Sequence, residues 1–198
     1  MAIASQFMTL EDYLHYDDGT ATHYELEDGE LLRMPPGSDL NQRVASFLFA
    51  VLVRMGIPFY RIRIGAEIVV SGARATVRVP DLMVLSEELA QALEGASRST
   101  VTLDMPPPQL VVEVVSPGKE NEDRDYRYRR SQYESRGIAE YWIVDPSRKQ
   151  VTVLRWVEGL YEDEVFTGDG AIASPLLSEF NPGAVLTAAQ VLQIEANA

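Results

Sequence analysis

The feature that most constrains this chain is one acidic residue inside an apolar run at residues 110–115. The run has the sequence LVVEVV, and apart from Glu113 it is typical of a central strand that is covered on both faces. A buried charge without a partner is strongly destabilising, so we expect Glu113 to bind something. Two interpretations follow. Glu113 is a metal ligand, or it is a buried glutamate paired with an arginine.

A second carboxylate, Asp81, lies in another predicted strand at residues 77–85. It follows Pro80, which has no backbone N–H and indicates an edge, a bulge or a break in pairing. On neighbouring strands, Asp81, Glu113 and the carbonyl oxygen of Val114 would form a set of hard oxygen ligands suited to Mg²⁺ or Mn²⁺. Such an ion can activate a water and neutralise charge on a phosphodiester. The simpler alternative for Asp81 is a strand-end carboxylate that caps a turn.

A helix is predicted at residues 121–136, between the strand of Glu113 and a strand at 138–144. This order predicts a parallel β-α-β unit, in which the helix supplies a cationic group beside the carboxylates. Tyr141 and Trp142 alternate along the second strand, so we expect them to pack on opposite faces of the sheet.

Asp28-Gly29 lies between two short extended runs and predicts a type I′ hairpin at residues 23–34. Glu25 in this hairpin is a candidate accessory ligand, and a cross-strand pair on the surface is the simpler expectation. We expect the strands at 59–70, 77–85 and 110–115 to form one antiparallel meander. Further helices are expected at 9–14, 40–55, 86–93 and 187–192, and a further strand at 150–157 that leads into a C-terminal hairpin.

Length and composition limit the class of protein and the kind of site. The order of elements predicts an α/β or α+β fold with a mixed sheet, in a single domain at residues 1–198. The chain has no cysteine, which excludes disulfides, zinc-thiolate sites and thiol nucleophiles. Its two histidines, His15 and His23, argue against a histidine-rich metal site or a Ser-His-Asp triad.

The charge and hydropathy of the chain limit its partners and location. A formal net charge of −13 argues against a broad basic face for duplex DNA, and it leaves open a small basic cleft or a carboxylate metal site. No apolar run approaches the roughly 20 residues that span a bilayer. The N-terminal residues lack the pattern of a signal peptide, so we expect a cytoplasmic protein with no membrane association.

Several strings of this sequence resemble the Uma family of restriction endonucleases, in the PD-(D/E)xK nuclease superfamily. They are Pro80-Asp81, the string E-x-x-S-P that begins at Glu113, and the string G-I-x-E-Y-W-x-V-D-P that begins at Gly137. The resemblance covers about residues 9–192. It implies a restriction-endonuclease-like core at about 38–157, with a four-stranded mixed central sheet flanked by helices, an N-terminal hairpin and a C-terminal β extension.

The resemblance also implies roles for particular residues. Asp81 and Glu113 match the metal ligands. The lysine that the superfamily has two residues after the glutamate is Val115 here, and in this family it is found on the following helix at the position of Arg129. Arginine keeps the positive charge but does not give up a proton near neutral pH, so Arg129 would clamp a phosphate and would be a poor general base. A solvated helix face is the alternative for Arg129.

The expected function is therefore Mg²⁺- or Mn²⁺-dependent hydrolysis of DNA phosphodiester bonds, and the resemblance adds a homodimer to this expectation. The alternative is a non-catalytic nuclease-fold module for binding or assembly, which the net charge of −13 and the arginine at position 129 favour. The other arginines of the helix, at 124, 127, 130 and 136, are expected to pair with acidic residues rather than to contact DNA.

Overall fold

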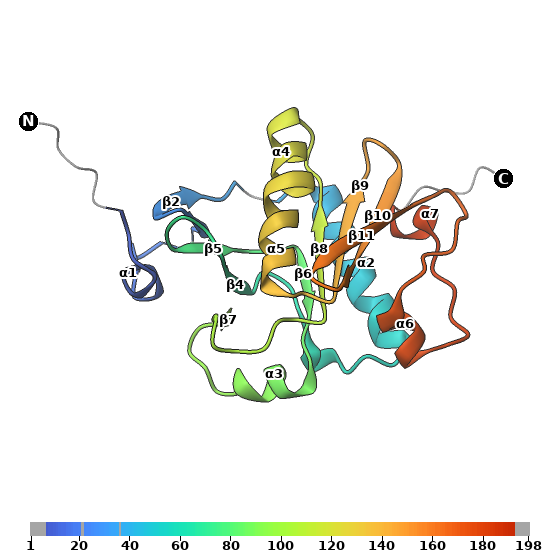
Figure 1. The fold of residues 1–198 in the computed structure, drawn as a ribbon, viewed down its shortest axis with the longest axis horizontal. Helices are drawn as coiled ribbons and strands as arrows, with labels where there is room; N and C mark the ends of the chain where they lie inside the picture. Colours follow the sequence, from blue (N-terminus) through green and yellow to red (C-terminus); the bar gives the residue numbers. More distant parts are fainter. Residues whose placement is uncertain (1–6, 21, 36, 193–198) are drawn as a thin grey trace, which may run out of the picture.

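The strands of this protein form two sheets that lie side by side (Figure 1). The computed structural model describes residues 7–20, 22–35 and 37–192, and within these ranges the larger sheet has six strands and the smaller has five. The six-stranded sheet has the order β11-β10-β9-β8-β6-β3 and is mixed, because β8 and β9 are parallel and its other pairs are antiparallel. Its strands are β3 (Ile62–Arg63), β6 (Leu82–Val84), β8 (Leu110–Val114), β9 (Glu140–Asp145), β10 (Gln150–Val157) and β11 (Leu160–Thr167).

The five-stranded sheet contains the N-terminal hairpin and has the order β2-β1-β5-β4-β7. It is also mixed, because β4 and β7 are parallel and its other pairs are antiparallel. Its strands are β1 (Tyr24–Glu27), β2 (Glu30–Arg33), β4 (Glu67–Val70), β5 (Thr76–Arg78) and β7 (Thr100–Val101). Asp28 and Gly29 both have positive φ, 47° and 84°, so the predicted type I′ hairpin is confirmed.

Helices cover both faces of the six-stranded sheet (Figure 1). On one face, the apolar side chains of α2 (Asp39–Arg54), α6 (Pro175–Phe180) and α7 (Ala188–Val191) pack on those of β8, β9 and β10. On the other face lie α3 (Glu87–Ala92), strand β4 and a long helical segment, drawn in yellow, that runs from α4 to α5. This segment consists of α4 (Lys119–Asp123), the π-helix η2 (Arg124–Arg129) and α5 (Arg130–Arg136).

Strand β8 lies in the interior of the six-stranded sheet, as its apolar sequence predicted. Val112 and Val114 belong to the core under α2, whereas Val111 belongs to the core under α5. The parallel pairing of β8 with β9 across the helical segment confirms the predicted β-α-β unit. Trp142 and Tyr141 are buried in the two opposite cores, as their alternation along β9 predicted.

The expected antiparallel meander is confirmed for β3, β6 and β8, which pair consecutively, but two of the expected strands are each divided between the sheets. Residues 59–70 form the 3₁₀ helix η1 (Phe59–Arg61) followed by β3 and β4, and Gly65 between these strands has φ 70°. Extended pairing cannot continue through this left-handed backbone, so β3 joins one sheet and β4 the other. Residues 77–85 divide at Pro80 in the same way, which confirms the expected break in pairing.

Two further differences concern the C-terminal part of the chain and the width of the sheet. The pattern did not predict α6, which begins after the N-cap Ser174 with Pro175 in its first turn. The six-stranded sheet is wider than the four strands implied by the resemblance, because β3 and β11 add edge strands. The short helix α1 (Leu10–Leu14) has a complete capping box between Thr9 and Asp12. No helix in the described ranges is long and apolar enough to cross a membrane.

Candidate functional site

Asp81 lies where the chain passes from one sheet to the other, between the end of β5 and the start of β6. Strand β6 pairs directly with β8, which brings Asp81 to the C-terminal end of β8. The backbone N–H of Val114 donates a hydrogen bond of 2.7 Å to Oδ2 of Asp81. The two predicted strands are therefore neighbours, and Pro80-Asp81 is the crossover between the sheets.

Glu113 projects from β8 toward the helical segment and is 2% exposed. The hydroxyl of Tyr133 in α5 donates a hydrogen bond of 2.7 Å to its Oε1. Its Oε2 forms a salt bridge with Nη1 of Arg129. The buried glutamate thus has an arginine partner, as one of the two interpretations predicted, and this partner is the arginine at the position implied by the resemblance.

Arg129 is buried in the π-helix and contacts three carboxylates. Besides Glu113, its Nη2 donates to Oε1 of Glu25 at 2.7 Å, and its Nε lies 3.7 Å from Oδ1 of Asp125. The residue is 2% exposed, so the alternative of a solvated helix face is wrong. The wider turn of a π-helix places Asp125 and Arg129 together on the inner side, and such segments frequently occur at functional sites.

Glu25 is a central member of the site, which the expected surface pair did not anticipate. It is 2% exposed, and it accepts hydrogen bonds from the N–H of Val79 at 2.9 Å and from Nη1 of Arg78 at 3.3 Å. The sequence does contain a signal for this arrangement. Arg78 stands in the apolar segment TVRV, and a buried arginine in a strand requires an acidic partner.

These side chains line one cavity of about 290 Å³ between β1, β8, the start of α2 and the helical segment. Asp81, Glu113 and Val114 all border it, together with Glu25 and Arg129. Val115, the position that the sequence resemblance matches to a lysine, lies instead in the apolar core. The cation that pairs with Glu113 is Arg129, from the helical segment.

Burial disfavours the charged forms of Asp81 and Glu113, the two carboxylates at the crossover. Burial raises the pKa of Asp81 from 3.8 to about 6, and the hydrogen bond from Val114 and the charge of Arg129 oppose this only in part. Burial also raises the pKa of Glu113, against the opposing charge of Arg129. For Arg129, burial alone would lower the pKa, but Glu113 and Glu25 raise it well above its usual value. Arg129 is therefore a permanent cation, and a further cation at the carboxylates would be stabilised.

The oxygen atoms at the cavity fit a hard divalent cation. The Val114 carbonyl accepts a hydrogen bond of 3.0 Å from Nδ2 of Asn41, and a carbonyl oxygen has a second lone pair. Across the described residues, no group of three or more histidine or acidic side chains is arranged to hold a metal ion. The candidate donors would be Asp81, Glu113 and the Val114 carbonyl, and both oxygens of Glu113 already have protein partners. This set suits Mg²⁺, which is commonly bound through one or two carboxylates, waters and substrate phosphates.

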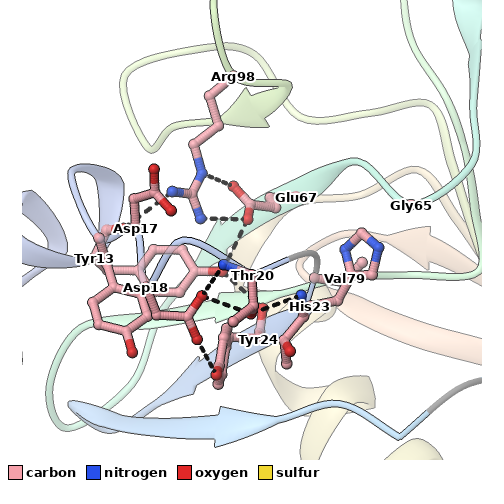
Figure 2. Close-up of a pocket in the computed structure, with 12 residues that line it drawn as sticks. Tyr13, Asp17, Asp18, Thr20, His23, Tyr24, Gly65, Glu67, Val79 and Arg98 are labelled. Atoms are coloured by element: carbon pink, nitrogen blue, oxygen red, sulfur yellow. Dashed lines mark hydrogen bonds and ion pairs between the residues drawn. The ribbon is translucent and has the colours of Figure 1, made fainter.

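A second polar cavity, of about 190 Å³, lies beside α1 and contains neither Asp81 nor Glu113 (Figure 2). Glu67 is the centre of its hydrogen bonds. Arg98 contacts Glu67 through Nη2 and Nε, each at 2.7 Å, and the hydroxyl of Tyr13 donates to Glu67 at 2.9 Å. These contacts hold α1 on the five-stranded sheet, so we interpret this cavity as structural.

The two sheets, the helical segment and the carboxylates at the crossover define the class of fold. A solved structure from Anabaena variabilis, described as a putative nuclease belonging to DUF820, matches it with a TM-score of 0.68 and 18% sequence identity. The match covers 94% of this chain and 98% of that chain, so the fold is nuclease-like. The chain belongs to the Uma2 family, described as "Putative restriction endonuclease", which matches residues 10–189. This confirms the family that the motifs predicted. No curated protein matches the chain.

Proposed function

We propose that this protein is a metal-dependent endonuclease that hydrolyses DNA phosphodiester bonds. The observation that carries the proposal is the meeting of Asp81, Glu113 and the Val114 carbonyl at one cavity, with the guanidinium of Arg129 beside them. The description of the Uma2 family and that of the Anabaena structure support the same class of reaction.

Asp81, Glu113 and the Val114 carbonyl would hold Mg²⁺ or Mn²⁺. When bound, the ion would neutralise charge on the phosphate and make a water more nucleophilic. Tyr133 holds Oε1 of Glu113 in place through its hydroxyl, and the N–H of Val114 orients Asp81. These contacts fix both carboxylates before a substrate arrives, which lowers the cost of organising the site.

Arg129 would stabilise negative charge that develops on the phosphate. Its pKa, raised by Glu113 and Glu25, keeps it protonated, so it does not act as a general base. Its Nη1 pairs with Oε2 of Glu113, so that oxygen would be free to hold a metal only if the guanidinium moved aside. Glu25 offers the guanidinium a second carboxylate to which it remains bound.

A divalent-metal titration tests the proposal. The wild type should nick plasmid DNA and degrade single strands in Mg²⁺ or Mn²⁺ and should not do so in EDTA. Asp81→Asn and Glu113→Gln should each lower the rate by about 100-fold or more, because each removes a charge that holds the metal. The exposed Asp104, which does not line the cavity, provides the matched control Asp104→Asn.

A second readout separates metal binding from catalysis. Mn²⁺ should raise the melting temperature of the wild type and of Asp104→Asn, because a ligand that binds only the folded state stabilises it. It should raise that of Asp81→Asn much less. Absence of cleavage with every metal, together with no melting shift in the wild type, would refute the proposed function.

A non-catalytic module for binding or assembly is the second candidate, and the burial of Arg129 among three carboxylates favours it. In this case the ion-pair network holds the fold together where a metal would otherwise bind. Arg129→Lys distinguishes the two. Cleavage gained only in this variant indicates a nuclease that has lost its activity. The homodimer expected from the resemblance is a separate proposal, which light scattering tests against a monomer mass of 22.1 kDa.

A further inference from the structure

A groove that is distinct from the cavity beside α1 continues from the carboxylate cavity along the start of α2. This groove, of about 400 Å³, is lined by the end of β2, the first turns of α2 and the segment between β3 and β4. Its walls include Asp81, and both it and the carboxylate cavity are bordered by Met34, Asn41 and Val79. A molecule bound with one group at Asp81 would therefore extend into this groove.

The lining of the groove combines apolar walls with a few hydrogen-bonding side chains. Met34, Val79 and Ile64 provide apolar surface, and Ile64 remains 53% exposed although it is a large aliphatic residue. Gln42 and Ser46 of α2 add polar atoms at the side. A concave apolar site of a few hundred Å³ with a few polar groups is typical of small-ligand recognition, and a planar heterocycle matches this chemistry.

The charges around the cavity suit a short piece of polynucleotide rather than a long duplex. Arg33, at the end of β2, and Arg124, in the π-helix, both line the carboxylate cavity. Arg124 contacts Asn121 and Asp125, whereas Arg33 has no ion pair within residues 7–20, 22–35 and 37–192. Against a net charge of −13, two arginines can contact one or two phosphates only.

We propose that this groove binds the base of an unpaired nucleotide in single-stranded DNA, beside the phosphodiester that lies at Asp81. The proposal rests on the proposed nuclease function, since it assigns the substrate class of that same site. A base inside a duplex is stacked and paired, so it cannot enter a recess at the side of α2 unless it is extruded. Van der Waals contacts between the base and the aliphatic walls add to the few phosphate contacts that Arg33 and Arg124 can make.

Fluorescence anisotropy of labelled oligonucleotides tests the groove without any need for cleavage. The probes are a single-stranded dT oligonucleotide, the same length of abasic strand, and the dT·dA duplex, each measured in EDTA, in which no cleavage is expected. We expect the dT strand to bind at least about fivefold more tightly than the abasic strand and the duplex, because base contacts supply much of the affinity.

Variants of the groove should weaken this binding selectively. Ile64→Ser removes exposed apolar surface and Ser46→Trp fills the groove, and each should raise the Kd for the dT strand about five- to tenfold. Val165→Ser is the matched control, because Val165 is 52% exposed on β11 and lies outside the groove. Ala50→Trp serves in the same way for α2, because Ala50 is exposed and does not border the groove.

Equal affinity for the abasic strand, or unchanged binding in both groove variants, would overturn the groove proposal. Preference for the duplex would overturn it as well. These outcomes are independent of the proposed function, because cleavage in the metal titration can succeed while the groove variants bind as the wild type does. Conversely, base-dependent binding that the groove variants weaken would support the groove even if no metal produced cleavage.

Discussion

At the scale of single residues, the site depends on the ion pairs that Arg129 forms with several carboxylates. Arg129 contacts Glu113, Glu25 and Asp125. Glu25 also forms a salt bridge with Arg78. Removing one partner from a buried network of this kind usually destabilises a fold by several kcal/mol, because the remaining charges stay buried and unpaired. The same network keeps Asp81 near positive charge without pairing it directly.

Asp81→Asn should stabilise the metal-free protein at neutral pH. Burial raises the pKa of Asp81 to about 6 in the folded state, so its charged form at pH 7 opposes folding. At about 1.4 kcal/mol per pKa unit, the free energy of unfolding in EDTA should rise by about 1 to 3 kcal/mol at pH 7.5. The asparagine can still accept the hydrogen bond from Val114.

The pH dependence of this effect provides its check. The stability that comes from protonated Asp81 is fully present below pH 3.8, the usual pKa of an aspartate. It is lost as the pH rises through about 6, the pKa in the folded state. Urea unfolding at several pH values should therefore show a gain that disappears toward pH 4. The exposed Asp169 provides the control Asp169→Asn, with less than about 0.5 kcal/mol of change. A stability loss in Asp81→Asn at pH 7.5 would contradict the assigned burial cost.

At the scale of elements, the N-terminal hairpin positions one carboxylate of the site, Glu25. Strand β1 pairs with β5 through Leu26 and Val77, and this pairing brings Glu25 to the N–H of Val79 and to Arg129. The turn of the hairpin packs closely against the preceding chain, where the N–H of Met8 donates to the carbonyl of Gly29 at 2.8 Å. The geometry of a surface turn therefore influences a buried carboxylate.

Gly29→Ala should destabilise the protein more than the equivalent change in the other hairpin. Both Gly29 and Gly159 have positive φ, 84° and 97°, so an alanine is strained by about 1 to 2 kcal/mol at either position. At Gly29 the added Cβ would also lie 2.8 Å from Cβ of Phe7, whereas Gly159 has open space. We expect urea unfolding to give a further loss of about 1 to 2 kcal/mol at Gly29. If both variants lost the same free energy of unfolding, Phe7 would be able to move away from the added Cβ at no cost in stability, which would contradict this prediction.

At the scale of the whole molecule, the distribution of charge limits which nucleic acids the proposed site could bind. The formal net charge is −13, and arginines outside the cavity pair with acidic neighbours, for example Arg127 with Asp123 and Arg130 with Asp163. Affinity through the phosphate backbone is consequently small. This favours recognition through local contacts at the cavity and the groove.

The salt dependence of oligonucleotide binding should be weak. Each phosphate contact on a single strand contributes a slope of about −0.7 to the plot of log K against log salt concentration, so contacts from Arg33 and Arg124 alone predict about −1.4. Anisotropy titrations between about 50 and 200 mM salt would measure the slope. Arg33→Ala should reduce its magnitude by about half. A slope steeper than about −4 would indicate a broad basic face and contradict this account.

The sequence by itself predicted the central strand, the hairpin, the β-α-β unit and the family, because these depend on local patterns. An apolar run, an Asp-Gly turn and alternation along a strand describe the immediate surroundings of each residue. The same reasoning identified Glu113 and Asp81 as candidate site residues, since a carboxylate in a buried strand and one after a strand proline are unusual in any fold. For Glu113 it also predicted two partners and left the choice between them open.

Only the tertiary structure decided how these elements meet. The division of residues 59–70 and 77–85 between two sheets depends on pairings with strands far away in the chain, which no local pattern records. Arg129 is buried because it lies in a π-helix turn and because Glu25, which belongs to the other sheet, pairs with it. Such contacts depend on long-range packing, so the carboxylate in the apolar run acquires its neighbours only when both sheets are assembled.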